Sequence, residues 1–500
     1  MLLISRLLIL LYVSMLISCR VALPPRYQVK HLGALPTMDH SVKENLKNTT
    51  TFSQGDWPQK AWWRVYGSSE LNHLITEALV QNPSILEMNS RIQVARQEAI
   101  VTGSVLFPLV FFNATETKQY TSQHGLYRAF NSKFPLSAYI VDLSLSFNYE
   151  FDFWGQNHNL LYEAIGRERV REAEAAQVVL MTTTALAQAY FAYKTNLIRK
   201  ELYEQLVMVR MDLTELNSLL LHKGLSSALA PFQATENASE AKKLLANINE
   251  ELAVDKHLIN ILAGRGPDTP LGIGKALPAL PSRPVIPKTL SIDLLARRPD
   301  LMAQIWRAKA LAYKTGAAMA DFYPNVNIIG LIGLQATSWK TLFATTSGTS
   351  AIKPALNLPI FTAGAIRANI NAIRAQFDAA IFAYNNLLLQ STQEVLDVLA
   401  FAQSIDQQNQ EQATILYYAE KRFNLVLLRQ QKGLDSRFDT YRLQEDVIQV
   451  KLTKVMLLYN QYLASIKLTK ALGGGYCQAK VPLVNKCSAP LQCNVSDNLR

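Results

Sequence analysis

Apolar residues recur every three or four positions over two very long stretches of the chain. The longer runs from Gly364 to Gly475 and contains no proline. Such steps keep one apolar stripe facing a partner helix, as in a supercoiled bundle. Residues 364–432, if helical throughout, would span about 100 Å. The first part of this stripe comprises Ile366, Ile370, Ile373, Phe377, Ile381, Tyr384, Leu388, Val395, Leu399, Ala402 and Ile405.

A second long helix is predicted from Gly155 to about Lys223, followed by a shorter helix from about Ser227 to Leu262. Gly433 interrupts the first stripe, so the chain contains two long helices that each end in a break and continue as a shorter helix. A further helical pattern runs from Trp62 to about Thr102.

The period changes to two between residues 139 and 152. Val141, Leu143, Leu145, Phe147, Tyr149 and Phe151 alternate there with Asp142, Ser144, Ser146, Asn148, Glu150 and Asp152. This alternation suits a strand with lipid on one side and water on the other. A soluble sheet with one solvated face gives the same pattern. Three more strands are predicted at residues 110–121, 326–334 and 352–360.

The two halves of the chain repeat each other. A shift of 216 places Pro83 on Pro299 and Pro108 on Pro324, and a shift of 209 places Gly224 on Gly433. Each half therefore reads as helix, two strands, very long helix, break and shorter helix, and such duplication is a strong indication of fold. We expect the first repeat at 62–266 and the second at 289–475, joined by a stiff proline-rich linker at 267–288.

Four membrane strands leave open sheet edges, and an unpaired backbone group in a bilayer costs several kcal/mol. Closure therefore requires an oligomer: two copies supply eight strands and three copies supply twelve. The predicted fold is a membrane β-barrel continued by a barrel of long helices.

The N-terminus resembles an export signal, and we expect residues 1–18 to be a signal peptide. Leu16-Ile17-Ser18-Cys19 matches the lipobox of bacterial lipoproteins, which predicts acylation of Cys19; an ordinary signal peptide followed by a chance cysteine is the alternative. Residues 19–61 then form an extended, lipid-anchored leader. Residues 476–500 form a tail with three cysteines, so at most one disulfide can form within it.

The formal net charge of +11 is spread along the chain, whereas nucleic-acid binders more often concentrate it in a patch. No catalytic constellation, metal-ligand spacing or phosphate-binding loop is present in the sequence. We therefore predict a protein that is not an enzyme and has no cofactor or metal. Gly264-Arg265-Gly266 is interpreted as a helix stop.

Several strings resemble the TolC-type outer-membrane efflux proteins, with the lipoprotein branch (NodT and OprM-like) the most similar. The resemblance covers about residues 60–476. It is carried by Trp62-Trp63, Leu71-Asn72-X-Leu74-Ile75, Ala78-Leu79-X-X-Asn82, Pro108, Pro324, Pro359-Ile360-Phe361-X-X-Gly364-X-X-Arg367-Ala368 and Lys470-Ala471-Leu472-Gly473-Gly474-Gly475.

The resemblance implies a homotrimer with a 12-stranded barrel in the outer membrane and an α-barrel in the periplasm. It also implies a periplasmic adaptor (membrane fusion protein) and an inner-membrane pump as partners. The predicted function is a passive exit duct with a gated periplasmic aperture. The alternatives are an outer-membrane component of type I protein secretion and a coiled-coil lipoprotein that does not conduct.

The same resemblance suggests functional positions after the second helix break. It places Phe438, Asp439 and Arg442 at the pore aperture, where the family carries acidic residues at the last two of these positions. Asp439 fits that pattern and Arg442 departs from it. The two side chains can pair across one helical turn, and an exposed pair of this kind contributes only about 0.2–0.5 kcal/mol.

The turns at Gly224-Leu225 and Gly433-Leu434 resemble the tips with which family members contact the adaptor. The alternative is a helix break in which glycine only supplies a positive φ.

Overall fold

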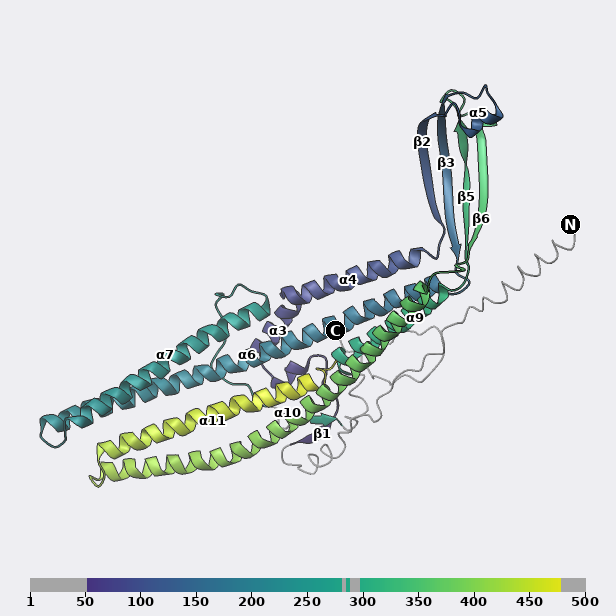
Figure 1. Cartoon of the computed structure of the whole chain (residues 1–500). Helices are drawn as coiled ribbons and strands as arrows, with labels where there is room; N and C mark the ends of the chain where they lie inside the picture. The colour runs from purple at the N-terminus through teal and green to yellow at the C-terminus, as the bar shows by residue number, and fades with distance from the viewer. Residues whose placement is uncertain (1–51, 281–284, 288–296, 478–500) are drawn as a thin grey trace. The chain divides into compact units, whose positions relative to one another are not determined.

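The computed structural model describes residues 52–280, 285–287 and 297–477, in two compact units. Within these residues, unit 1 holds 93–170 and 304–383, and unit 2 holds 52–92, 171–303 and 384–477 with the gaps just stated. The helices α4 (Pro83–Ser104), α6 (Gln156–His222), α9 (Pro299–Ala320) and α10 (Ala365–Gln431) each pass from one unit to the other (Figure 1).

Unit 1 contains an antiparallel sheet of four strands in the order β2-β3-β5-β6. The strands are β2 (Leu109–Tyr120), β3 (Ser137–Phe151), β5 (Asn325–Ala336) and β6 (Gly348–Asn357). The short helices α5 (Leu126–Phe130) and η2 (Thr345–Ser347) lie in the loops at one end of the sheet, and the long helices leave from the other end (Figure 1). The four predicted strands are therefore confirmed.

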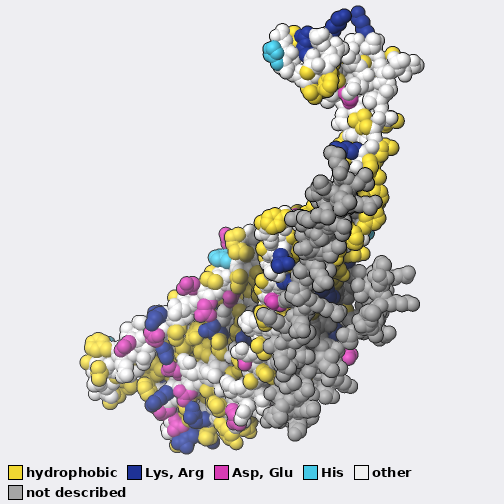
Figure 2. Space-filling model, turned by 45° about the vertical axis from the view of Figure 1, so that its right-hand side comes forward, with side chains coloured by type: hydrophobic (Ala, Val, Ile, Leu, Met, Phe, Trp, Pro, Cys, Tyr) yellow, Lys and Arg dark blue, Asp and Glu magenta, His cyan; other side chains and the backbone are white. Residues whose placement is uncertain are grey.

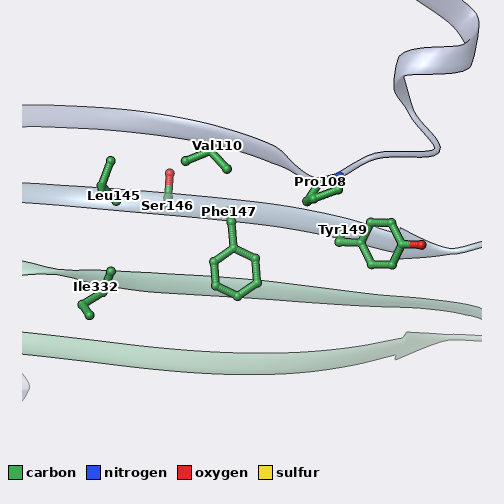
Figure 3. A pocket seen from close by; sticks show the side chains of 7 residues that line it. All are labelled: Pro108, Val110, Leu145, Ser146, Phe147, Tyr149 and Ile332. Carbon is green, nitrogen blue, oxygen red and sulfur yellow. The ribbon is translucent and has the colours of Figure 1, made fainter.

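The sheet has one apolar and one polar face, as the alternation in β3 predicts. In the register, Phe147 lies opposite Val110 on β2 and Gly330 on β5. A Cβ atom on Gly330 would overlap the Phe147 ring, which extends over β5 (Figure 3). An apolar groove of about 500 Å³ surrounds this ring, lined by Pro108, Val110, Leu145, Ser146, Phe147, Tyr149 and Ile332.

Hydrogen bonds between polar side chains cover the opposite face. Asn113 donates to Ser146 Oγ (2.9 Å), and Asn325 donates to the Glu150 carboxylate (2.7 Å). A sheet with one apolar face and one hydrogen-bonded polar face suits the wall of a water-filled membrane barrel.

The helices of unit 1 pack closely. A Cβ atom on Gly166 of α6 would lie 2.9 Å from Ala310 Cβ of α9, so the backbones approach where both residues are small. Ala318 of α9 packs with Ile370 and Ile373 of α10. These two isoleucines belong to the predicted stripe, as do Leu388, Val395, Leu399, Ala402 and Ile405, which are all buried in unit 2.

The core of unit 2 is aromatic. It joins the 3₁₀-helix η1 (Trp62–Tyr66) and α3 (Ser69–Gln81) to α6, α7 (Leu229–Ala263) and α11 (Arg437–Ala471). Phe191 stacks on Tyr462 with ring centroids 4.0 Å apart, and Tyr66 contacts both rings. Residues of the first and second repeat therefore share one core.

The prediction of one helix from Trp62 to Thr102 is wrong, because three separate helices occupy this range. Pro83 lacks a backbone N–H and begins α4, where the missing donor does no harm. The Asn82 side chain accepts hydrogen bonds from the backbone of Ser84 and Ile85, and its amide donates to Leu262 of α7. The break is thus a capped corner attached to a neighbouring helix.

The described part of the proline-rich segment packs against unit 2. Tyr462 donates to the Pro278 carbonyl, and Lys194 donates to the Ala276 carbonyl (2.5 Å). Lys194 also forms an ion pair with Glu70 (2.8 Å). Further along, β4 (Val285–Pro287) pairs in parallel with β1 (Ser53–Gly55), which the sequence reading did not predict.

Candidate functional site at the helix breaks

Both long helices end in the same hydrogen-bonded turn. Gly224 and Gly433 have φ values of 69° and 74°. Leu225 N donates to Leu220 O (2.8 Å) after α6, and Leu434 N donates to the carbonyl of Arg429 (2.9 Å) after α10. This is a Schellman motif, in which a left-handed glycine allows the last carbonyls of a helix to be satisfied.

The residue after each glycine exposes a large apolar side chain. Leu225 is 72% exposed and Leu434 is 65% exposed. The two turns lie at the same end of unit 2 (Figure 1). Each break therefore has the structural role of a helix end, and each also presents an apolar side chain to solvent.

The second break carries a set of polar contacts. Arg429 donates to both carboxylate oxygens of Asp435, at 2.7 and 3.1 Å, and this ion pair spans the turn. Ser436 and Asp439 form a capping box at the start of α11: Asp439 N donates to Ser436 Oγ (3.2 Å), and Ser436 N donates back to Asp439 Oδ2 (3.2 Å). The turn is therefore fixed on both sides.

The capping box also sets the charge state of Asp439. The Ser436 hydroxyl donates to its carboxylate (2.6 Å), and this bond, with the Ser436 backbone N–H and the nearby charge of Arg442, lowers the pKa of Asp439. Hydrogen bonds to a carboxylate favour its ionised form. Asp439 therefore carries a negative charge in an exposed position.

The three predicted aperture residues lie on the first turns of α11 and are all exposed, with Phe438 at 40%. In the described chain no ion pair joins Asp439 to Arg442: the carboxylate accepts from Ser436, and Arg442 acts on it only through its nearby charge. Asp439 thus caps the start of α11 together with Ser436 and does not pair with Arg442. The signal was present as Ser436-X-X-Asp439, the usual pattern of a capping box, and the sequence reading missed it.

The first break lacks these polar contacts. With the repeat offset of 209, Leu220 takes the place of Arg429, Ser226 that of Asp435 and Ala230 that of Asp439. The helix α7 begins with Ala228 as N-cap and without a side-chain cap. The two breaks thus share their backbone geometry and differ in their side chains.

Ion pairs connect the helices behind the breaks. Arg210 of α6 donates from Nε (3.0 Å) and Nη2 (2.6 Å) to Glu445 of α11, and from Nη1 to the Asn237 carbonyl of α7 (2.8 Å). Arg422 of α10 pairs with Asp446 of α11 (2.8 Å). The start of α11 is therefore attached to α6 and α10, and through Arg210 indirectly to α7. Nothing in the local sequence indicated these partners.

Two further predictions concern cysteines and metals. Cys19 lies outside the described residues, as do Cys487 and Cys493. Cys477 is described and is disulfide-bonded. No group of three or more potential metal ligands occurs within the described ranges.

None of the helices that the structure describes combines the length and the apolar character needed to cross a membrane.

A duplicated chain with four membrane-type strands and two helices of 67 residues defines a class of protein, the strand-and-helix ducts of outer membranes. The family model for outer membrane efflux proteins matches residues 74–262 and 290–474. The chain belongs to this family.

Individual relatives agree with this assignment. The chain is 26% identical over 461 residues to the multidrug resistance outer membrane protein MdtQ of Escherichia coli O6:H1, covering 87% of this chain and 94% of MdtQ. It is 28% identical over 448 residues to MdtP of Shigella flexneri, with coverage of 88% and 91%. The crystal structure of the outer membrane protein VceC of Vibrio cholerae superposes with a TM-score of 0.75 at 30% identity, covering 84% of this chain and all of VceC.

The protein is thus an outer-membrane channel and not an enzyme. Channels of this family form trimers and work with adaptor proteins and inner-membrane pumps in tripartite systems. Three copies of the sheet described above supply the twelve strands that the sequence predicts.

Proposed function

We propose that this chain is the exit duct of a multidrug efflux system and that its periplasmic aperture lies at the second helix break. The observation that carries the proposal is the exposed, ionised carboxylate of Asp439 on the first turn of α11. In a trimer the three carboxylates form a ring around the axis. Such a ring concentrates cations, because charges that act across a narrow aqueous path focus the local field.

The proposed substrates, drugs of several classes, are inferred from the names of two relatives. MdtQ and MdtP are named as multidrug resistance proteins, and the absence of catalytic residues in the sequence suits a passive conduit. The type I secretion role shares the same architecture and remains the alternative within this fold. Growth tests separate the two, since deletion of an efflux duct sensitises cells to several unrelated drugs and leaves protein export intact.

Conductance in planar bilayers tests the aperture. Asp439→Asn removes the charge and keeps an oxygen that accepts from Ser436, so it separates electrostatics from helix capping. We expect the cation preference of the channel to fall in Asp439→Asn and to stay unchanged in the matched variant Asp446→Asn. An unchanged preference in both variants would exclude Asp439 from the aperture, and a protein that never conducts would contradict the duct.

Phe438 and Arg442 complete the proposed aperture. Phe438 narrows it with an exposed ring, and Arg442 reduces its negative charge. Arg442→Ala should therefore raise the cation preference, opposite in sign to Asp439→Asn. A change of the same sign would place Arg442 away from the ion path.

We expect the adaptor to bind the two turns, one formed by Gly224 and Leu225 and the other by Gly433 and Leu434. Exposed apolar side chains on rigid turns suit a contact that excludes water. Leu225→Ser and Leu434→Ser should each weaken cross-linking to the adaptor in cells, whereas Leu258→Ser, an exposed leucine on α7 away from the turns, should not. Equal cross-linking in all three variants would contradict this role.

Acylation of Cys19 is the proposed anchor. Cys19→Ala should abolish labelling with radioactive palmitate, with Cys487→Ala as the matched control. Labelling that persists in Cys19→Ala would mean that the lipobox interpretation is wrong.

A further inference from the structure

The loop end of the sheet in unit 1 is basic and contains no acid. Residues 117–141, which comprise the end of β2, the connecting loop and the start of β3, hold Lys118, Arg128 and Lys133 and no Asp or Glu. Residues 337–347, which join β5 to β6, hold Lys340 and again no acid. Figure 2 shows dark-blue side chains gathered at this end of the sheet beside yellow apolar ones. We call Lys118, Arg128, Lys133 and Lys340 the loop-end basic surface.

Lys118 lies on the apolar face of the sheet. It is directly opposite Tyr139, in the same register row as the pairs Val110–Phe147 and Phe112–Leu145, so its side chain shares their face. Its Nζ lies 5.3 Å from the ring centres of both Tyr120 and Tyr139. A cation held between two tyrosines on an apolar face is typical of a membrane boundary, where amphipathic rings sit at headgroup level.

The distance along the strand places Lys118 at that boundary. From Val110 to Lys118 the strand rises about 27 Å along its own axis, which is about 20 Å across the membrane at a tilt of about 40°. Lys118 therefore lies near the outer end of an apolar band of about 25 Å. The opposite boundary is marked by Trp154, whose ring stacks on Tyr323 with centroids 4.6 Å apart. A lysine on the lipid-facing side is costly at the centre of a bilayer and nearly neutral at its edge.

The loops that carry the other basic residues are held in place. Tyr127 stacks on Phe134 with ring centroids 5.1 Å apart, and the Arg128 guanidinium donates to the Ser132 carbonyl. Thr121 N donates to Leu136 O (2.7 Å) and closes the loop at its base. Large apolar side chains are exposed beside the charges: Tyr120, Leu126, Tyr127, Phe130, Trp339 and Phe343.

We propose that the loop-end basic surface binds the phosphate groups of lipid headgroups in the outer leaflet. The proposal rests on membrane insertion of the sheet as described above. The loops that carry Arg128, Lys133 and Lys340 hold no acid, so these cations complement phosphate. Lys118 faces lipid, and a water-borne partner cannot reach that side of the sheet. Glu116 and Asp142 are the nearest acids in the strands. Glu116 shares the face of Lys118 and lies two residues farther from the loops, whereas Asp142 lies on the polar face, where Ser144 (2.6 Å) and Gln335 (3.3 Å) donate to it.

The test compares two lipids on the full-length protein in detergent. We expect diphosphoryl lipid A to bind more tightly than its dephosphorylated counterpart, by about fivefold for each basic residue that contacts phosphate at low salt. The variant Lys118→Gln, Arg128→Gln, Lys133→Gln, Lys340→Gln should lose this preference. Raising the salt should weaken it in the unmodified protein, because exposed charges are screened.

A matched control removes four exposed basic residues from unit 2, as Arg64→Gln, Lys242→Gln, Lys421→Gln, Lys432→Gln. This variant should keep the preference for the phosphorylated lipid. Equal binding of both lipids by the unmodified protein would overturn the proposal, as would an unchanged preference in the loop-end variant. Competition by free inorganic phosphate at equal concentration would also overturn it, since that result indicates a soluble anion site.

Channel conductance separates this proposal from the duct function. The loop-end variant should conduct in bilayers of neutral lipid as the unmodified protein does. A loss of lipid preference with intact conductance supports the headgroup site. Absent conductance in the unmodified protein contradicts the duct function alone, because the lipid comparison in detergent does not depend on conductance.

Discussion

The Arg210 guanidinium donates two hydrogen bonds, at 3.0 and 2.6 Å, to a single carboxylate oxygen of Glu445. The two residues lie 235 positions apart and join α6 of the first repeat to α11 of the second. Their side chains are 14% and 25% exposed, so the pair is partly desolvated. It holds in place the helix whose first turn carries Asp439.

A double-mutant cycle on Arg210 and Glu445 should therefore give a coupling free energy of about 1–2 kcal/mol in thermal unfolding. Because loss of the pair frees α11, Arg210→Ala should also raise single-channel conductance. The exposed pair Arg422–Asp446 is the matched control and should couple by less than about 1 kcal/mol. Equal coupling in the two cycles would contradict the special role of Arg210.

The capping box predicts a pH dependence. The pKa of Asp439 is lowered in the folded protein, so its contribution to stability is present above the unfolded pKa of about 3.9 and is lost as the pH falls through the folded value. The difference in melting temperature between the unmodified protein and Asp439→Asn should be constant from pH 7 to pH 5 and should shrink at pH 3. A difference that grows below pH 4 would have the wrong sign for this cap.

Replacing glycines by alanine measures two separate costs: the strain of a positive φ and the overlap of the new Cβ atom with neighbouring atoms. Gly433 has a positive φ and open space where a Cβ would lie, so Gly433→Ala should cost about 1 kcal/mol. Gly473 has a φ of 85°, and a Cβ there would also overlap the carbonyl of Arg297. Gly473→Ala should cost clearly more in thermal unfolding, while Gly224→Ala should match Gly433→Ala. Equal costs at all three sites would show that the crowding at Gly473 relaxes freely.

Two glycines in the sheet give a similar contrast. A Cβ on Gly333 would overlap the backbone carbonyl of Leu143 on the neighbouring strand, whereas Gly348 has open space around it. Gly333→Ala should therefore disturb strand pairing and lower the temperature at which the trimer dissociates on a gel. Gly348→Ala should leave that temperature unchanged, and a reversed order would argue against the register of β3 with β5.

The elements of the fold were predictable because their signals are local. The stripe containing Val395 and Leu399 is buried, and the alternation around Phe147 matches a sheet with two unlike faces. The corner at Asn82-Pro83 was missed because the helical period continues across it. The β1–β4 pair was missed because three-residue strands carry no period of their own.

The chemistry of the breaks was only partly predictable. Gly224 and Gly433 are visible in the sequence because a positive φ selects glycine. The capping box of Ser436 and Asp439 was also visible but was not recognised, whereas the partnership of Arg210 with Glu445 depends on helix packing between residues far apart in the chain. Charges that meet only through tertiary contacts leave no pattern in the sequence.

The unequal side chains of the two breaks have a mechanical consequence. The turn after α10 is clamped by Arg429–Asp435 and by the Ser436 cap, whereas its counterpart after α6 has neither. A stiff turn cannot serve as the joint of a moving part, so an opening of the proposed aperture would move α10 and α11 together as one rigid hairpin. Movement of this hairpin against the one formed by α6 and α7 then requires contacts between them, such as Arg210–Glu445, to break.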